Sequence, residues 1–403
     1  MTQTQEHNVP ALRFPEFSGE WESNTIADVA EVKGGKRLPL GNSLSDIDTG
    51  FPYITVSDFE NGSVSLEKIK FVPKSVQPSI ARYTISSDDI YISVAGTLGL
   101  VGIIPQKLGG ANLTENADKL TKITLNRDFL LQFLKSERLK KLIKSVQTNN
   151  AQPKLSIAAI KKMKVGFPDA PEQQKIADFL SSVDSKIEQL SKKKALLEQY
   201  KKGVMQKLFS RELRFKDANG NDFPEWVEKR LCKMAIIVMG TSPKSESYNN
   251  HSEGLPLIQG NADIRDRKSA PRVFTSVVTK ECLPADILLS VRAPVGEVSI
   301  STRHACIGRG ISAVRATQSN VQEFLYQFLL WYEPRWRRIS QGSTFESVNS
   351  DDIKQLKCPN PSQLEQQKIA DFLSSIDDKI DLITTELTQA QVFKKGLLQQ
   401  MFV

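Results

Sequence analysis

Glu172-Gln-Gln-Lys-Ile-Ala-Asp-Phe-Leu-Ser-Ser182 occurs twice in this sequence. The second copy, Glu365 to Ser375, is identical letter for letter and begins 193 residues after the first. Extending the alignment from each copy gives 19 identical residues in 39 positions. Because the two copies are so similar, we expect the two segments to share one structure and one role.

The regions before the two copies also correspond, although less closely. Phe129-Leu130-x-Gln132-Phe133-Leu134 matches Phe324-Leu325-x-Gln327-Phe328-Leu329, and Leu12-Arg13-Phe14 is echoed by Leu213-Arg214-Phe215. The chain of 403 residues is therefore predicted to contain two divergent lobes, each followed by a repeated segment. The predicted boundaries are 1–168 and 211–360 for the lobes, and 169–210 and 361–403 for the repeated segments.

Apolar residues recur at alternating spacings of four and three along both repeated segments. This heptad pattern predicts one long spacer helix in each segment, about 55 Å long for about 37 residues. Asp169-x-x-Glu172 and Ser362-x-x-Glu365 fit the capping box, in which the glutamate reaches back to the backbone of the cap residue. The expected seam residues are Ile176, Leu180, Val183, Ile187, Leu190, Leu197, Val204 and Leu208 in the first helix, and Ile369, Leu373, Ile376, Ile380, Ile383, Leu387, Leu397 and Met401 in the second.

More apolar residues lie beside the first seam than a pair of helices would bury. They are Phe179, Leu196, Tyr200, Met205 and Phe209. We therefore expect partner helices from other chains to cover them. The alternative is that the helices only dimerise or pack on their own lobes.

Each lobe is predicted to be a mixed α+β unit, which makes the fold class of the chain α+β. Short apolar runs such as Ile90 to Val94 and Ile287 to Val291 alternate with turn residues, as is typical of strands. One helix is expected after the strands of each lobe, at Arg127 to Val146 and at Val321 to Ile339. The loops between these elements are free to carry function.

The chain is basic, with a formal net charge of +8 and an isoelectric point near 9.1. Each lobe has 21 basic and 17 acidic side chains, so the two lobes share the excess equally. Basic and amide residues cluster in loops, and such side chains bind base edges or phosphates. A solvated surface position is the alternative for each single residue. The candidate DNA-binding residues are Lys33, Lys36, Arg37, Asn149, Asn150, Gln152, Lys154, Lys244, Arg265, Arg267, Lys268, Arg292, Arg303, Arg309, Gln341 and Ser343.

Sequence signals for catalysis, metal binding and membrane insertion are missing. The sequence has no G-x-x-x-x-G-K-[ST] loop and no Asp/Asn-Pro-Pro-aromatic segment of the kind that amino-methyltransferases use. Its four cysteines are widely separated, so we expect reduced thiols and no structural metal. No apolar run approaches about 18 residues, and residues 1–10 are polar, so a cytoplasmic protein without a membrane span is expected.

With two variable lobes, the duplicated segment from Pro171-Glu-Gln-Gln-Lys-Ile-Ala-Asp-Phe-Leu-Ser-Ser-x-Asp184 resembles the specificity subunit of type I restriction-modification systems. The resemblance covers essentially the whole chain. It implies that each lobe is a target recognition domain reading one half of a split, asymmetric site in double-stranded DNA. It also implies that the two helices form an antiparallel coiled coil with a pseudo-two-fold repeat, set the distance between half-sites and dock two modification subunits.

The same resemblance implies that this chain binds DNA without catalysing a reaction. S-adenosylmethionine would belong to the modification subunits, which methylate adenine, and ATP and Mg to restriction subunits and their complex. One alternative is a non-DNA adaptor with two ligand-binding lobes on a coiled coil. A second is a self-sufficient methyltransferase, which the missing cofactor and target-base motifs disfavour.

Overall fold

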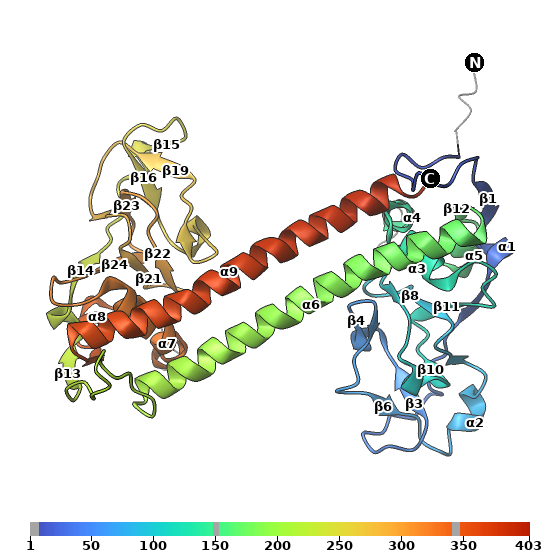
Figure 1. Ribbon diagram of the computed structural model, residues 1–403, viewed down its shortest axis with the longest axis horizontal. Coiled ribbons are helices and arrows are strands. Elements are labelled where there is room, and N and C mark those ends of the chain that lie inside the picture. Colours follow the sequence, from blue (N-terminus) through green and yellow to red (C-terminus); the bar gives the residue numbers. More distant parts are fainter. Residues whose placement is uncertain (1–7, 148–152, 341–346) are drawn as a thin grey trace. The chain divides into compact units, whose positions relative to one another are not determined.

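The structure is a computed structural model that describes residues 8–147, 153–340 and 347–403 (Figure 1). Contacts divide the chain into unit 1, residues 1–191 and 386–403, and unit 2, residues 192–385. The long helices α6 (Ala170–Phe209) and α9 (Gln363–Gln400) each contribute a segment to both units. Among the described residues, no helix is long and apolar enough to cross a membrane.

The lobe of unit 1 is built on two small sheets of four strands, with strand orders β6-β3-β10-β7 and β2-β11-β8-β9. Strands β10 and β3 pair in parallel, and the other neighbours in these two sheets are antiparallel. The elements of the lobe are β1 (Glu22–Thr25), α1 (Ile26–Val29), β2 (Glu31–Gly34), β3 (Pro52–Ile54), β4 (Phe59–Glu60), β5 (Ser63–Val64), β6 (Lys70–Phe71), α2 (Gln77–Ile80), β7 (Thr84–Ile85), β8 (Ile90–Ser93), β9 (Val101–Gly102), β10 (Ala111–Leu113), β11 (Ala117–Thr121), α3 (Arg127–Lys135), α4 (Glu137–Gln147), α5 (Ile157–Lys161) and β12 (Lys164–Phe167).

The lobe of unit 2 repeats this plan with sheets of order β14-β24-β21-β22-β18-β17 and β15-β19-β16-β23-β20. Two of its strand pairs are parallel, β16 with β23 and β18 with β22, and the first of these corresponds to β3 with β10. The elements are β13 (Val227–Arg230), β14 (Ala235–Met239), β15 (Tyr248–Asn249), β16 (Leu255–Ile258), β17 (Ile264–Arg265), β18 (Lys268–Ser269), β19 (Val273–Thr275), β20 (Glu281–Cys282), β21 (Ile287–Ser290), β22 (Val298–Ile300), β23 (Ala305–Ile307), β24 (Ile311–Ala316), α7 (Gln322–Ser340), α8 (Ser350–Lys354) and β25 (Lys357–Asn360).

The predicted helix after the strands is present in both lobes. In unit 2 it is the single helix α7, as expected. In unit 1 the prediction of one continuous helix was wrong, because the chain turns at Ser136 and forms α3 and then α4. The Ser136 backbone is extended, with ψ near 178°, and its N–H bonds the carbonyl of Phe133.

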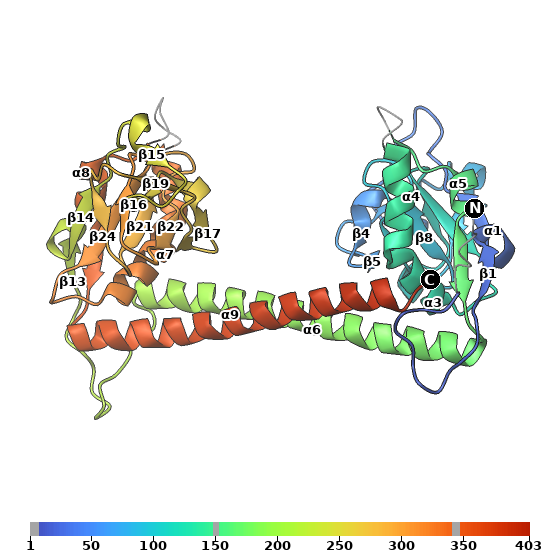
Figure 2. The same ribbon diagram turned by 90° about the horizontal axis from the view of Figure 1, so that it is seen from above.

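In each unit, helix α3 or α7 lies between the strands of the lobe and the long helices (Figure 2), and the main core of the unit includes this helix. Phe129 and Phe133 of α3 share the unit 1 core with Ile176 of α6 and Met401. In unit 2, Phe324 and Phe328 of α7 take the same place, next to α6 and α9. Helices α3 and α7 therefore join each lobe to the repeated segments.

All the expected seam residues of α6 and α9 are buried or half-buried, including Leu190 and Ile383 in the middle parts of the helices. The expectation that other chains cover the flanking residues was wrong for Met205 and Phe209. Both are buried in the core of unit 2, because the end of α6 packs against α7.

Candidate nucleic-acid interface

The duplicated glutamates anchor the helix starts to their own lobes. Arg13 donates to Glu172 from Nε and Nη2 at 2.8 and 2.7 Å, and Glu172 is 1% exposed. Arg214 makes the same pair with Glu365, at 3.3 and 3.1 Å. Asp169 and Ser362 do cap the helices, accepting from the N–H groups of these glutamates. The expected reach-back to the cap was wrong, because both carboxylates turn to arginine instead.

The duplicated glutamine after each glutamate joins α6 or α9 to the helix of its lobe. Gln173 accepts from the N–H of Asn126, at the start of α3, and donates to the carbonyl of Pro168. Gln366 does the same with Val321, at the start of α7, and Pro361. The duplicated glutamate and glutamine thus make equivalent contacts in both units, which accounts for their identity in the two segments.

A duplicated aspartate links the two long helices within each unit. In unit 2, Asp377 of α9 accepts from Lys201 of α6 at 2.6 Å and from Gln327 of α7 at 2.8 Å. In unit 1, Asp184 accepts from Lys394 and Gln132. Lys201 and Lys394, which occupy equivalent positions of the repeat, therefore both pair with a carboxylate of the other long helix.

Each lobe also repeats a clipped loop after its central strand. Ser93 Oγ donates to the carbonyl of Thr97 and accepts from the N–H of Leu100. In unit 2, Ser290 Oγ donates to Pro294 and accepts from Glu297 in the same way. The same two serine hydrogen bonds therefore close loop residues 94–99 and 291–296, whose tips differ in sequence.

Both lobes also share a close backbone contact at the glycine that follows β2 or β14, and we call this contact the glycine frame. A Cβ on Gly35 would lie 2.0 Å from the carbonyl oxygen of Thr114, and one on Gly240 would lie 2.2 Å from that of Gly308. The next residues donate to equivalent carbonyls, Lys36 to Leu113 at 2.8 Å and Thr241 to Ile307 at 3.0 Å. Only glycine permits this close approach of the two loops.

In unit 2 the clipped loop and the glycine frame both line an open polar cleft of about 580 Å³. Arg292 comes from the clipped loop, Arg309 follows β23, and Ser242 follows the glycine frame. Both arginine side chains are exposed. The other lining residues are Pro243, Ser245, Tyr248, Gln259, Gly260, Asn261, Ser290, Ala293 and Gly310. Guanidinium, amide and hydroxyl groups converge here, as hydrogen bonding to bases and phosphates requires.

In unit 1 the equivalent loops carry a charge pair. Arg37 donates from Nε to Glu115 at 2.7 Å, and the Arg37 side chain is 71% exposed. Burial alone would raise the pKa of Glu115, but hydrogen bonds from Arg37 and Thr114 hold this pKa below its usual value. Lys154 lies at the same end of the lobe, since the next residue, Leu155, donates to Val94 in the clipped loop.

The remaining predicted residues do not all join these two sites. Lys33 pairs with Glu31 at 2.7 Å on the surface, and Lys36 lies 5.9 Å from the ring of Tyr83. Lys244 is exposed beside the cleft lining of unit 2. Arg265, Arg267 and Lys268 belong to the β17–β18 hairpin, where Arg267 is bound to Glu333 at 2.7 Å. Asn149, Asn150, Gln152, Gln341 and Ser343 lie outside the described residues.

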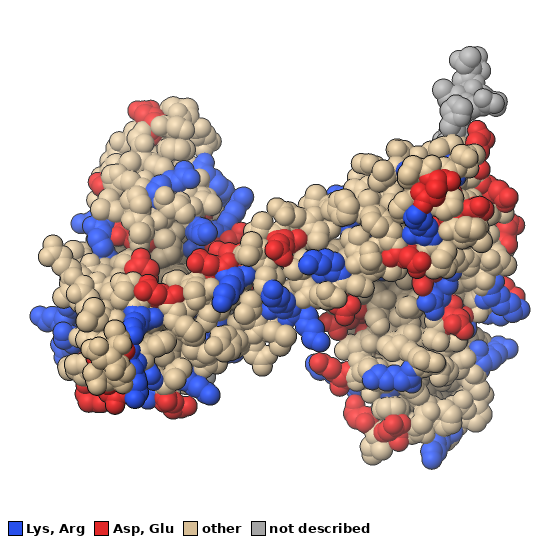
Figure 3. Space-filling model, in the orientation of Figure 1, with Lys and Arg blue, Asp and Glu red and all other residues tan. Residues whose placement is uncertain are grey.

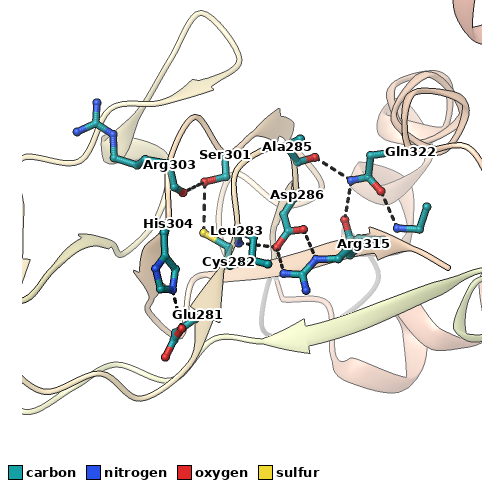
Figure 4. A network of polar contacts seen from close by, with 12 residues as sticks. Glu281, Cys282, Leu283, Ala285, Asp286, Ser301, Arg303, His304, Arg315 and Gln322 are labelled. Atoms are coloured by element: carbon teal, nitrogen blue, oxygen red, sulfur yellow. Dashed lines mark hydrogen bonds and ion pairs between the residues drawn. The ribbon is translucent and has the colours of Figure 1, made fainter. Parts of the chain in front are cut away.

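Arg303 lies at the edge of a structural network in unit 2 (Figure 4). Its side chain points away from this network, while its carbonyl accepts from Ser301. Nearby, Arg315 makes a two-point pair with Asp286 at 2.6 Å, and His304 contacts Glu281. The network therefore joins strands of the two sheets of this lobe, and the Arg303 side chain is directed away from it.

On the face drawn in Figure 3, Lys and Arg side chains are interspersed with Asp and Glu. Within the described parts of the chain, no group of three or more His, Cys, Asp or Glu residues could hold a metal ion. Cys282, Cys306 and Cys358 are buried thiols, whereas Cys232 is exposed.

Sequence reasoning missed Glu115, Ser242, Gln259 and Asn261 as members of these sites. Glu115 lies two residues after the end of β10 and Ser242 three residues after the end of β14, and the residues they contact are 78 and 67 positions away in the chain. A hint existed in the duplicated pattern, because Gly35 and Gly240 precede Lys36 and Thr241 in equivalent loops. Without the strand pairing, however, nothing in the sequence aligns those loops.

Comparison with known proteins gives consistent matches along the chain. The family model described as the type I restriction modification DNA specificity domain matches residues 18–199 and 224–391. The type I restriction enzyme MjaX specificity subunit of Methanocaldococcus jannaschii is 30% identical over 98% of this chain and 95% of its own. The MjaVIII specificity subunit of the same organism is 24% identical over 96% of this chain and 92% of its own.

Solved structures have the same fold. The S subunit of a type I restriction-modification system from M. genitalium matches with a TM-score of 0.64 and 17% identity, over 98% of this chain and 99% of that one. A chain from a study of complex assembly and conformational transition in a type I system matches with a TM-score of 0.56 and 20% identity, over 96% and 98% of the two chains.

Proposed function

Because this chain belongs to the family of type I restriction-modification DNA specificity domains, we propose that each of its lobes reads one half of a bipartite, asymmetric DNA site. In this proposal the chain itself is not catalytic. Loops at the Arg292 and Arg37 ends of the lobes enter the major groove of double-stranded DNA. Contacts to phosphates supply affinity, and contacts to base edges supply sequence choice.

One observation carries the proposal: the lobes share their framework contacts but differ at the loop tips. The loop-closing hydrogen bond of Ser93 recurs at Ser290, and the close backbone contact of Gly35 recurs at Gly240. The tips present Arg292 and Arg309 in one lobe and the Arg37–Glu115 pair in the other. One framework with two sets of polar side chains is what two different half-sites require.

We further propose that α6 and α9 form an antiparallel, pseudo-two-fold spacer that docks two modification subunits. Tyr200 and Phe393 occupy equivalent positions of the repeat and are 53% and 55% exposed. Leu196 lies one turn from Tyr200, and Val392 lies beside Phe393. Two equivalent exposed aromatics suit two copies of one partner, since aromatic side chains are enriched at the centres of interfaces.

The partner subunits supply the chemistry in this proposal. Modification subunits carry S-adenosylmethionine and methylate adenine, and restriction subunits with ATP and Mg join the full cytoplasmic complex. The role of this chain is then to choose the sequence.

The experiment is to purify the chain together with its candidate modification subunits and to measure retention of duplex DNA by gel shift. Sequencing of methylated sites in a host carrying the system identifies the DNA sequence. We expect a single split motif, and we expect Arg292→Ala to weaken binding and to flatten its dependence on salt. A complex that retains no duplex, or a methylome without a split motif, contradicts the proposal and favours an adaptor that does not bind DNA.

A further inference from the structure

Two positions in the paired loop frames are equivalent between the lobes but differ in charge. Arg37 and Ser242 each lie two residues after the constrained glycine, Gly35 or Gly240. Glu115 and Arg309 each lie two residues after the last residue of the parallel strand β10 or β23. Thr114 and Gly308 lie between these strand ends and Glu115 or Arg309. Their backbone N–H groups make equivalent hydrogen bonds, to the carbonyls of Ile54 and Ile258.

The contacts between the two positions direct their side chains differently. In unit 2, Ser242 Oγ accepts from the backbone N–H of Arg309 at 3.1 Å and makes no bond to its guanidinium. Arg309 is exposed and lines the cleft together with Arg292. Among the residues that the structure describes, Arg309 has no ion-pair partner. In unit 1 the Glu115 carboxylate accepts from the Arg37 guanidinium, and the Glu115 side chain is 26% exposed.

We propose that Arg309 and Glu115 are the equivalent base-reading side chains of the two lobes, Arg309 for guanine and Glu115 for cytosine. This inference rests on the function proposed above. A guanidinium donates two hydrogen bonds to O6 and N7 of guanine, whereas a carboxylate accepts from the N4 amino group of cytosine. Hydrogen bonds from Arg37 and Thr114 favour the ionised form of Glu115, in which both carboxylate oxygens are acceptors.

The opposite charges of Arg309 and Glu115 favour base reading over phosphate binding at these two positions. A carboxylate repels phosphate, so a position that carries glutamate in one lobe is not a general phosphate contact. An exchange of charge at a fixed backbone position instead suits a change in the base that is read. The nearby cations, Arg37 in unit 1 and Arg292 in unit 2, remain available to the DNA backbone.

The test uses the full complex with its modification subunits and the split motif found by methylome sequencing. Binding is measured by competition with a panel of duplexes, each changed at one base pair of the motif. The variants are Arg309→Lys, which keeps the charge but loses the two-point geometry, and Glu115→Gln, which keeps the shape but loses the charge. Matched controls are Glu137→Gln, from the surface Glu137–Lys140 pair in unit 1, and Lys357→Gln, from the Lys357–Glu228 pair in unit 2.

We expect each variant to lose roughly 10- to 100-fold of discrimination at one G·C position, in a different half-site for each variant. Discrimination at the other base pairs and the gap between the half-sites stay as in the wild type. The control variants behave like the wild type at every position. Equal weakening across the whole panel, or unchanged discrimination at every position, overturns the assignment. If the wild-type complex has no split motif at all, the proposed function fails instead, before any variant is compared.

Discussion

Arg13 holds the buried carboxylate of Glu172 by two hydrogen bonds, although 159 residues separate them in the chain. The pair fixes the segment before β1 to the first turns of α6. Its counterpart, Arg214 with Glu365, has an additional donor, because Trp226 Nε1 also bonds Glu365 at 2.8 Å. Trp21, at the matching place in unit 1, makes no such bond, and its buried Nε1 has no partner among the described residues.

This asymmetry predicts unequal costs for removing the two arginines. Arg13→Ala leaves Glu172 buried without a charged partner, so we expect a loss of about 3 kcal/mol in the stability of unit 1. Arg214→Ala should cost less in unit 2, because Trp226 still donates to Glu365. Hydrogen exchange of peptides covering residues 170–180 and 363–373 measures both effects, with the exposed Lys107→Ala as control. Equal losses in the two variants would contradict the argument.

The helices were predictable from sequence because their pattern is local. Seam residues such as Ile176 and Ile369 follow the heptad rule, and the caps Asp169 and Ser362 lie three residues from the N–H groups they accept. The side-chain partner of each cap-box glutamate was not predictable. From the local sequence, the glutamate carboxylate is expected to accept from the backbone N–H of the cap residue. A distant arginine donates to this carboxylate instead, because a hydrogen bond between two charged groups is stronger.

The candidate DNA-binding residues show the same limit. Composition identified Arg292, Arg309 and Arg267 alike as basic loop residues. Strand pairing brings the first two into one cleft, whereas Arg267 is bound by Glu333 of α7. The burial of Met205 and Phe209 was missed for a similar reason, because their cover is α7, more than a hundred residues further along the chain.

Asp118 in unit 1 predicts a pH dependence of stability. It is 4% exposed, its Oδ2 has no partner among the described residues, and burial raises its pKa to about 6. The ordinary value is 3.8, so between these two values the folded state binds more protons than the unfolded state. Stability should therefore fall as pH rises from about 4 to about 6, by up to about 3 kcal/mol.

Asp118→Asn removes this titration. We expect the variant to melt at a higher temperature than the wild type at pH 8, and the difference to shrink below pH 4. Thermal unfolding across this pH range measures it, and Asp88→Asn, whose carboxylate is 93% exposed, serves as the control. A constant difference between Asp118→Asn and the wild type at every pH would show that the carboxyl does not titrate as described.

Tyr200 and Phe393 predict the stoichiometry of the proposed complex. Replacing either by serine removes the apolar centre of one docking surface, and we expect such a loss to weaken binding by roughly 2 kcal/mol or more. Each single variant should then copurify with one modification subunit and the double variant with none, as read by native mass spectrometry. Leu40→Ser, at a side chain that is 97% exposed in the lobe of unit 1, is the control. Two retained subunits in the double variant would exclude these surfaces.

Lengthening both helices tests the proposed spacer. Seven residues added to α6 after Lys193 and to α9 after Glu386 keep the heptad register and add about 10 Å, equivalent to about three base pairs of DNA. We expect methylome sequencing to show both half-sites unchanged and the gap between them longer by about three base pairs. The same insertion in the exposed turn at Asn219-Gly220 adds the same residues without lengthening a helix, so it should leave the gap unchanged. An unaltered gap in the lengthened variant, with methylation intact, would mean that something other than the helices sets the distance between the half-sites.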